Sequence, residues 1–315
     1  MRLPLARRPP ARHERPMTTA ARPDILCIGS VLWDLIGRTP AAMPPGADVP
    51  GRISRVPGGV ALNIAATLAQ LGLRPALLSA VGRDTEGEAL VAACAAMGLD
   101  TAHLYRSEDL PTDRYMAIEG AGGLVAAIAD AHSLEAAGAR ILRPLTEGPL
   151  GTPEAPWQGP VALDGNLTLT LLEEIATHPA FARADLRVAP ASPGKAERLM
   201  PFLRHGRATL YVNRTEAELL TGRSLDSAEA AVRALLERGA QRAVVTDGGR
   251  PACSGSAEGL VAAMPPQVLV ARVTGAGDAF MAAHVAAELR GAAPAAALDG
   301  ALAAAATHVS GEVPA

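Results

Sequence analysis

Cysteine is scarce in this sequence: three occur among 315 residues, and none of them forms a CxxC pair. So few thiols argue against a disulfide framework and against a zinc site built from paired cysteines. Cys27, Cys94 and Cys253 are instead predicted to be buried thiols in a reducing compartment, which we expect to be the cytoplasm.

Long apolar runs and strong net charge are also missing. No uninterrupted apolar stretch reaches the roughly 18 residues that span a bilayer, so no membrane segment is predicted. The net charge of −3 argues against a general nucleic-acid binder or a protein of anionic membrane surfaces. A hydrophobic content of 49% is enough for one sizeable α/β domain, and a small-molecule substrate is the expectation that remains.

The familiar nucleotide-binding signatures are absent as well. The sequence has no Walker GxxxxGK[ST], no HRD or DFG triplet, and no GxGxxG opening a Rossmann unit. Its histidines show no HExxH or other ligand spacing. Phosphoryl transfer by this chain would therefore need another scaffold.

Residues 1–22 are rich in arginine and proline and precede the first strand-like run. They predict either a disordered extension or a start codon assigned too early, with Met17 as the true first residue. A transit peptide is a third reading, because such peptides are rich in Arg and poor in acids, but the Pro pairs oppose an amphipathic targeting helix.

Short apolar runs alternate with helical patterns from residue 24 onward. "DILCIGS" and "RPALLSAVG" are strand-like, whereas "GGVALNIAATLAQLG" and "TEGEALVAACAAMGLD" are helical and end at glycine. Buried strands that are continuously apolar are typical of a mostly parallel sheet covered on both faces by helices. An α/β fold over residues 23–315 is therefore predicted.

Two strand-rich insertions interrupt this alternation, at about residues 35–57 and 111–130. The second has the pattern of a hairpin around Gly120–Gly123. If the two insertions pair, they form a small separate sheet, which we predict to be a lid.

Near the end of the chain, "VTGAGDAF" places Asp278 at the start of a helical pattern that follows the strand-like "QVLVARV". Open α/β sheets bind ligands where a strand ends and a helix begins, and glycines there let backbone N–H groups face an anion. Asp278 is then either a base that accepts a proton from a substrate hydroxyl or simply a helix cap.

"VNRTEAELLTG" places Asn213 and Glu216 three residues apart, on one face of a helical turn. An amide and a carboxylate together suit Mg²⁺, which takes one or two protein oxygens besides water and phosphate. A capping arrangement without metal explains the spacing equally well.

Two further groups of polar residues follow strand-like runs. One set comprises Gly29, Ser30, Asp34, Gly58, Gly59 and Asn63. Asp34 and Asn63 could hydrogen-bond adjacent hydroxyls of a sugar, although turns and caps explain each residue singly. "VVTDGG", in which Thr246 to Gly249 end a strand-like run, could lie along the phosphates of a nucleotide. Lys195 is the only lysine of the chain, so it is either a selected ammonium near phosphate or a chance surface residue.

Order and spacing add to these single motifs. "GGVALNIAATLAQLG", "NRTEAELLTG" and "VTGAGDAF" resemble, in that order, the hallmark segments of the ribokinase (PfkB) family of sugar and nucleoside kinases, over about residues 24–310. The resemblance implies a ribokinase-like fold, a β lid over the sugar, phosphoryl transfer from ATP with Mg²⁺, and use of a monovalent cation such as K⁺. It also implies a homodimer formed through the lid.

The resemblance also implies roles for individual residues. Asp278 is implied as the catalytic base, and the backbone of Gly275, Ala276 and Gly277 as the anion hole. The residues implied to contact the metal and the nucleotide are Asn213, Glu216 (which would bind Mg²⁺ through water), Thr246, Gly248, Thr274 and Lys195. The residues implied to bind the sugar hydroxyls are Asp34, Gly58, Gly59, Asn63, Asp164 and Asn166.

Within the family, "TDRYMAIEGAGGLVAAIADAHSLEA" and "VAPASPGKAERLMPFL" look most like segments of pseudouridine kinases. This similarity adds Thr112, Tyr115 and Asp130 as nucleoside contacts and implies phosphorylation of the 5′-hydroxyl of pseudouridine. The alternatives are a kinase of ribose, adenosine or a sugar acid, or a nucleoside-binding protein without turnover. Arg272 and Leu62 depart from the family pattern. The first departure concerns the surroundings of the nucleotide or the monovalent cation, and the second concerns the identity of the substrate.

Overall fold

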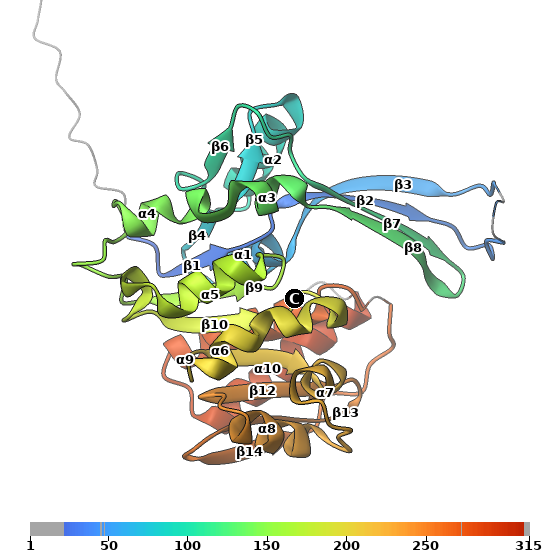
Figure 1. Cartoon of the computed structure of the whole chain (residues 1–315). Coiled ribbons are helices and arrows are strands. Elements are labelled where there is room, and N and C mark those ends of the chain that lie inside the picture. Colours follow the sequence, from blue (N-terminus) through green and yellow to red (C-terminus); the bar gives the residue numbers. More distant parts are fainter. Residues whose placement is uncertain (1–21, 45, 47, 272, 312–315) are drawn as a thin grey trace, which may run out of the picture.

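An eight-stranded sheet forms the centre of the protein (Figure 1). The computed structural model describes residues 22–44, 46, 48–271 and 273–311. The strand order is β14–β13–β12–β11–β10–β9–β1–β4, and the neighbours from β12 to β4 are parallel, whereas β13 and β14 are antiparallel. The strands are β1 Ile25–Ile28, β4 Pro75–Leu78, β9 Pro160–Asp164, β10 Asp185–Ala189, β11 Thr209–Asn213, β12 Arg242–Asp247, β13 Arg250–Ser256 and β14 Gly259–Ala263.

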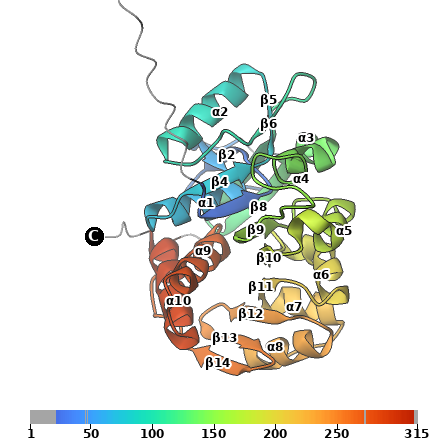
Figure 2. The ribbon, with the colours of Figure 1, turned by 90° about the vertical axis from the view of Figure 1, so that its left-hand side faces the viewer.

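Helices cover both faces of this sheet (Figure 2). Successive residues of a strand point to opposite faces, so Ile25 and Cys27 belong to one apolar core while Leu26 and Ile28 belong to the other. One core contains α1 Val60–Gln70, α2 Thr85–Ala96, α9 Ala276–Leu289 and α10 Pro294–Ser310. The other contains α3 His132–Ala137, α4 Arg143–Thr146, α5 Leu169–Thr177, α6 Met200–Arg204, α7 Arg214–Thr221 and α8 Ala228–Glu237.

The predicted α/β fold, with a mostly parallel sheet flanked by helices, is therefore confirmed. All three cysteines lie buried in these cores, as their scarcity predicts. None of the helices within the described part of the chain has both the length and the apolar content that crossing a membrane requires.

A second sheet projects from the side of the main body (Figure 1). Its order is β3–β2–β7–β8, with the strands β2 Leu32–Arg38, β3 Arg52–Gly58, β7 Arg114–Gly120 and β8 Gly123–Asp130. The two insertions at about 35–57 and 111–130 thus pair with each other, through the parallel contact of β2 with β7. A separate small pair, β5 Ala80–Gly82 and β6 Tyr105–Ser107, lies beside α2 and α3.

The expected strand over "QVLVARV" is wrong. Its described residues form no strand, and Val268, Leu269 and Val270 are 40%, 90% and 67% exposed. Pro265 and Pro266, which lack the backbone N–H donors that a strand needs, lie between β14 and this run. Arg272 and the extension before Arg22, including Met1 and Met17, lie outside the described residues.

Candidate active site

The carboxyl ends of the parallel strands and the amino ends of two helices meet at one edge of the main sheet. β1 lies between β4, the next main-sheet strand along the chain, and β9, from which the order continues to β12. A sheet built outward from one strand in both directions leaves a crevice at the carboxyl end of that strand. α1 follows β1 by way of β2 and β3, and α9 packs against α1, so residues from both ends of the sequence line this edge.

Asp278 stands in the first turn of α9 without capping it. The helix begins after Gly275, which has φ +85°, and no side chain caps it. The Asp278 carboxylate instead accepts a hydrogen bond of 2.9 Å from Nδ2 of Asn63 on α1, 215 residues away in the sequence. The structure therefore contradicts the simple cap reading and joins the two residues that the sequence predicted for base and sugar binding.

The electrostatic environment of Asp278 suits a base near neutral pH. Burial raises the pKa of Asp278 to about 7, the bond from Asn63 opposes this rise, and the nearby carboxylates of Asp164 and Asp34 add to it. A base works best when its pKa is close to the operating pH. A normal carboxyl with a pKa near 4 would be a much weaker proton acceptor.

The backbone amides of the GAGD turn are divided between the fold and the cleft. The N–H of Ala276, which the sequence predicts as part of an anion hole, donates to the carbonyl of Val273 at 3.1 Å and is thus paired within the turn. The amides of Gly277 and Asp278 donate no hydrogen bond to any described part of the chain. Because these amides lie in the first turn of α9, they form part of the positive end of the helix dipole, which favours an anion.

Asp34 lies on β2 of the second sheet, in register with Tyr115 of β7. Its carboxylate packs over Gly58, where a Cβ would come within 2.1 Å of Oδ2, so glycine is needed there. Burial raises the pKa of Asp34 to about 6, and burial together with the Asp34 charge raises the pKa of Tyr115. The carboxylate of Asp34 accepts no hydrogen bond from the part of the protein that the structure describes, which leaves both carboxylate oxygens available to a ligand.

Gly59 connects the second sheet to α1. It has φ +100°, and a Cβ there would lie 2.4 Å from the carbonyl oxygen of Ser30. Only glycine tolerates both conditions. The paired glycines therefore let the Asp34 carboxylate lie close to the start of α1, the helix that carries Asn63.

Asp164, predicted to contact sugar hydroxyls, is bonded within the chain through both of its carboxylate oxygens. It is fully buried at the end of β9. Oδ2 accepts from the backbone N–H of Ser30 at 2.7 Å, from its hydroxyl at 2.6 Å and from the N–H of Ala61 at 3.3 Å, while Oδ1 accepts from the N–H of Asn166. Asp164 thus ties β1, β9 and α1 together.

Asn166 and Lys195 extend this network outward. Nδ2 of Asn166 donates to the Ser30 hydroxyl at 3.0 Å, and the ammonium of Lys195 donates to Oδ1 of Asn166. Burial and the nearby Arg198 lower the pKa of Lys195. The only lysine is therefore a half-buried group beside the crevice, and the chance surface reading does not hold.

Two of the residues suggested as nucleoside contacts lie elsewhere. Thr112 is buried, and its N–H and hydroxyl both donate to Asp84, the residue that caps α2, at 2.8 and 2.6 Å. Asp130 is exposed at the end of the edge strand β8 and contacts His132 at 2.8 Å. Thr112 is thus structural, and neither residue lines the crevice in this conformation.

Asn213 and Glu216 form a capping box at the start of α7. Oδ1 of Asn213 accepts from the N–H of Glu216 at 2.9 Å, and Oε2 of Glu216 accepts from the N–H of Asn213 at 2.8 Å. Burial raises the pKa of Glu216. Thr246 lies opposite Asn213 in the β11–β12 register, and Gly248 (φ +60°) follows the end of β12.

This arrangement fits Mg²⁺ only in a form held chiefly by phosphate and water. Oε1 of Glu216 accepts no hydrogen bond within the described chain, so one oxygen is left for a metal-bound water. The described residues contain no group of three His, Cys, Asp or Glu side chains that could hold a metal. The described side chains therefore do not form a complete metal site by themselves.

His308 is the residue that sequence reasoning missed, whereas Ser30 belongs to the amino-terminal set that the sequence singles out, without a predicted contact of its own. Ser30 binds Asp164, Asn166 and the N–H of Val60 through one hydroxyl; its place directly after a strand and Gly29 was the available signal. His308 contacts the carbonyl of Thr274 at 2.8 Å. No local pattern marks this histidine.

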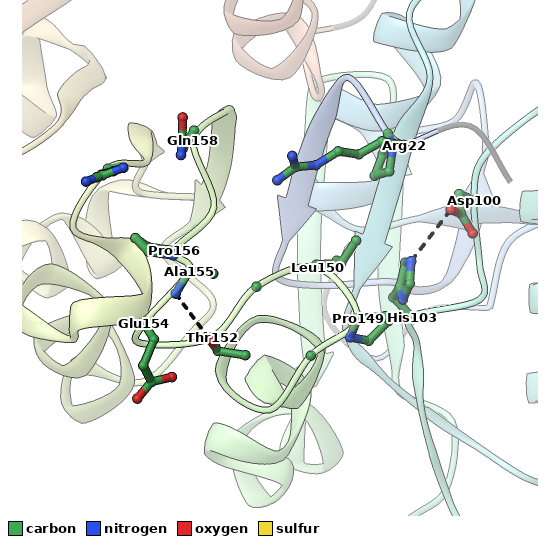
Figure 3. A pocket seen from close by; sticks show the side chains of 14 residues that line it. Arg22, Asp100, His103, Pro149, Leu150, Thr152, Glu154, Ala155, Pro156 and Gln158 are labelled. Atoms are coloured by element: carbon green, nitrogen blue, oxygen red, sulfur yellow. Dashed lines mark hydrogen bonds and ion pairs between the residues drawn. The ribbon is translucent and has the colours of Figure 1, made fainter. Parts of the chain in front are cut away.

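A surface pocket of about 880 Å³ lies at the opposite end of the sheet (Figure 3). Its wall includes Arg22, just before β1, and Arg183, just before β10, together with His103 and Leu150. These residues lie at the amino ends of the strands, so this pocket is separate from the crevice that holds Asp278.

Comparison with known proteins agrees with this geometry. Residues 22–312 match the model of the pfkB family carbohydrate kinases, and the chain belongs to this family. A pseudouridine kinase of Escherichia coli strain K12 is 30% identical over 269 residues, which are 82% of this chain and 81% of that protein. An uncharacterized sugar kinase of the same organism, YeiI, is 32% identical over 228 residues, 69% of this chain but only 59% of that relative.

Solved structures show the same fold. A carbohydrate kinase from Agrobacterium tumefaciens has a TM-score of 0.75 at 28% identity, with 90% of this chain and 89% of that chain covered. A ribokinase from Thermotoga maritima has a TM-score of 0.72 at 21% identity, with 91% and 93% covered. The chain therefore has the ribokinase-like fold, and its membership of the pfkB family makes it a sugar or nucleoside kinase.

Proposed function

We propose that this protein phosphorylates the 5′-hydroxyl of a ribosyl nucleoside with ATP, and that pseudouridine is its substrate. The observation that carries the kinase mechanism is the Asn63–Asp278 hydrogen bond beside the open amides of α9. The 30% identity with a pseudouridine kinase over 82% of the chain supports the choice of acceptor.

In the proposed reaction, the Asp278 carboxylate removes the proton of the 5′-hydroxyl. The hydroxyl oxygen then forms a bond to the γ-phosphorus as the bond from that phosphorus to the β-phosphate oxygen breaks, and ADP leaves. The Gly277 and Asp278 amides stabilise the negative charge of the transferring group. Asp34 and Asn63 hold the ribose so that its hydroxyl lies next to Asp278.

ATP and Mg²⁺ belong to this proposal, as does K⁺. Glu216 and Asn213 would hold the metal through water, next to Thr246, Gly248 and Thr274 along the phosphates. When bound, Mg²⁺ would neutralise charge on the phosphate oxygens. The second sheet, which carries Asp34 and Tyr115, would close over the nucleoside as a lid and exclude water.

The face of the second sheet that points away from Asp34 supports the expected homodimer. Leu35, Met116 and Ile128 lie one residue further along the paired strands than Asp34, hence on the other face. Exposed apolar side chains gather in this sheet: Ile53 is 84%, Met116 46%, Leu124 62% and Ile128 68% exposed. We propose that the same face of a second copy covers them.

An ADP-release assay of the purified protein tests the substrate. We expect ADP formation with pseudouridine and Mg²⁺, and much less with uridine, adenosine, ribose or a sugar acid at equal concentration. The product should be the 5′-phosphate, identified by mass and by its ³¹P spectrum. Turnover of ribose or adenosine without turnover of pseudouridine would overturn the acceptor and keep the kinase; nucleoside binding without any ADP would overturn the kinase itself.

The pH dependence of kcat/KM tests the base. Because the pKa of Asp278 is raised to about 7, the carboxylate is protonated below that pH, so kcat/KM should fall as the pH drops through about 7 and level off above it. Asn63→Ala removes the bond that lowers this pKa and should move the midpoint upward. A rate that stays constant down to pH 5 would contradict the assignment.

A further inference from the structure

The last turn of α10 packs on the segment that leads into the GAGD turn. The N–H of Ala271 donates to the carbonyl of Val309 at 2.9 Å. One residue earlier, Nε2 of His308 lies 2.8 Å from the carbonyl oxygen of Thr274. Two successive residues near the end of the described chain therefore hold the backbone on the approach to Asp278.

His308 also lies directly against Gly275. A Cβ at Gly275 would come within 3.0 Å of Nε2 and 3.1 Å of Cε1 of the imidazole. Gly275 has φ +85° and is the residue from which α9 starts. The ring thus fills the space beside the one residue of the turn that needs a left-handed backbone.

The chemistry of the contact fixes the state of the ring. A carbonyl oxygen can only accept, so Nε2 of His308 must carry the hydrogen and donate it to Thr274. This bond determines which way the Thr274–Gly275 peptide points. Reversal of that peptide would aim a carbonyl dipole, with its partial negative charge, at the phosphate, where the fold otherwise presents N–H groups.

We propose that His308 is a positioning residue for the phosphate-binding turn: its Nε2–H holds the Thr274 carbonyl away from the cleft and keeps the amides of Gly277 and Asp278 free for the nucleotide. This inference rests on the proposed kinase function. It gives the end of α10 a part in the active site, which His308 exerts through the backbone of Thr274.

Two substitutions at this position separate positioning from simple packing. His308→Ala removes the donor and should lower kcat/KM for ATP by about tenfold to a hundredfold, since small errors of alignment have effects of that size. The KM for the acceptor should change by less than about twofold. His308→Gln keeps an N–H donor at a similar distance and should recover most of the loss. Thr307→Ala is the matched control, because its hydroxyl bonds only within α10, to Ala303.

The measurements are steady-state kinetics at varied ATP, calorimetric titration with ADP, and thermal unfolding of each variant. The inference is overturned if His308→Ala matches the wild type in ADP affinity and in kcat/KM for ATP. It is also overturned if Ala and Gln lose activity equally and in parallel with stability, because that pattern indicates packing alone. A wild-type protein that neither binds ADP nor forms it from ATP would instead overturn the proposed function, and this inference with it.

Discussion

Asp278→Asn should lower kcat by at least about 10²-fold to 10⁴-fold and, at the same time, make the folded protein more stable at pH 8. Loss of a general base has an effect on rate of this size. The amide keeps the shape of the side chain, and its oxygen can still accept the hydrogen bond from Asn63. Activity is measured by ADP release, and stability by thermal unfolding.

The gain in stability follows from the sign of the pKa shift. The pKa of Asp278 is raised from 3.8 to about 7 in the folded protein, so the folded state binds the proton more tightly than the unfolded state. The stabilisation from protonation is complete below pH 3.8 and is lost as the pH rises through about 7. At pH 8 the ionised carboxylate therefore destabilises the fold by an amount on the order of a few kcal/mol, and Asn removes this effect.

The same comparison at pH 5 is the internal test. The difference between wild type and Asp278→Asn should shrink there, because the wild-type carboxyl is then largely protonated. Asp299→Asn, an exposed change on α10, is the control for losing one negative charge. Near-normal turnover in Asp278→Asn would remove the proposed base, and equal unfolding temperatures at pH 8 would contradict the raised pKa.

Much of the fold could be predicted because its signals are local. Short apolar runs became β1, β4, β9, β10, β11 and β12, and glycine-ended patterns became α1 and α2. "QVLVARV" has the composition of a strand, but its described residues pair with no strand of the sheet. Pairing partners are a property of the whole fold, and a run of seven residues does not contain them.

The candidate site shows the same division. The GAGD turn and the Gly58–Gly59 pair are local signals, so the sequence alone singles out Asp278, Asp34 and Asn63 as candidates. Their neighbours were beyond reach, because Asn63 meets Asp278 across 215 residues. Asn213 and Glu216 left a choice between cap and metal; the structure shows the cap and leaves one oxygen of Glu216 for the other role.

Carboxylates illustrate why residue type was insufficient. The sequence predicts contacts with sugar hydroxyls for both Asp34 and Asp164; Asp34 lies within β2 and Asp164 ends β9. Asp34 accepts no hydrogen bond from the described residues, while Asp164 accepts bonds from Ser30, Ala61 and Asn166. Only the donors that the fold places around each acid separate a ligand contact from a structural tie.

Asp164→Ala should therefore unfold far more easily than the wild type, with a loss of about 3–5 kcal/mol in the free energy of unfolding. Removal of the carboxylate leaves the buried N–H groups of Ser30, Ala61 and Asn166 without an acceptor, and each unsatisfied buried donor is costly. Because these donors fix the carboxyl ends of β1 and β9 and the start of α1, the crevice should lose its shape before the rest of the sheet melts.

Asp34→Ala is the matched comparison, since it removes a carboxylate from the same end of the fold. Burial raises the pKa of Asp34 to about 6, so the ionised carboxylate destabilises the folded protein at pH 8. Loss of this carboxylate should therefore stabilise the protein slightly, while the KM for the acceptor rises. Chemical unfolding and acceptor kinetics on both variants separate the two roles. If Asp164→Ala keeps wild-type stability and changes only the KM of the acceptor, Asp164 is a substrate ligand after all, and the crevice must open further than this structure shows.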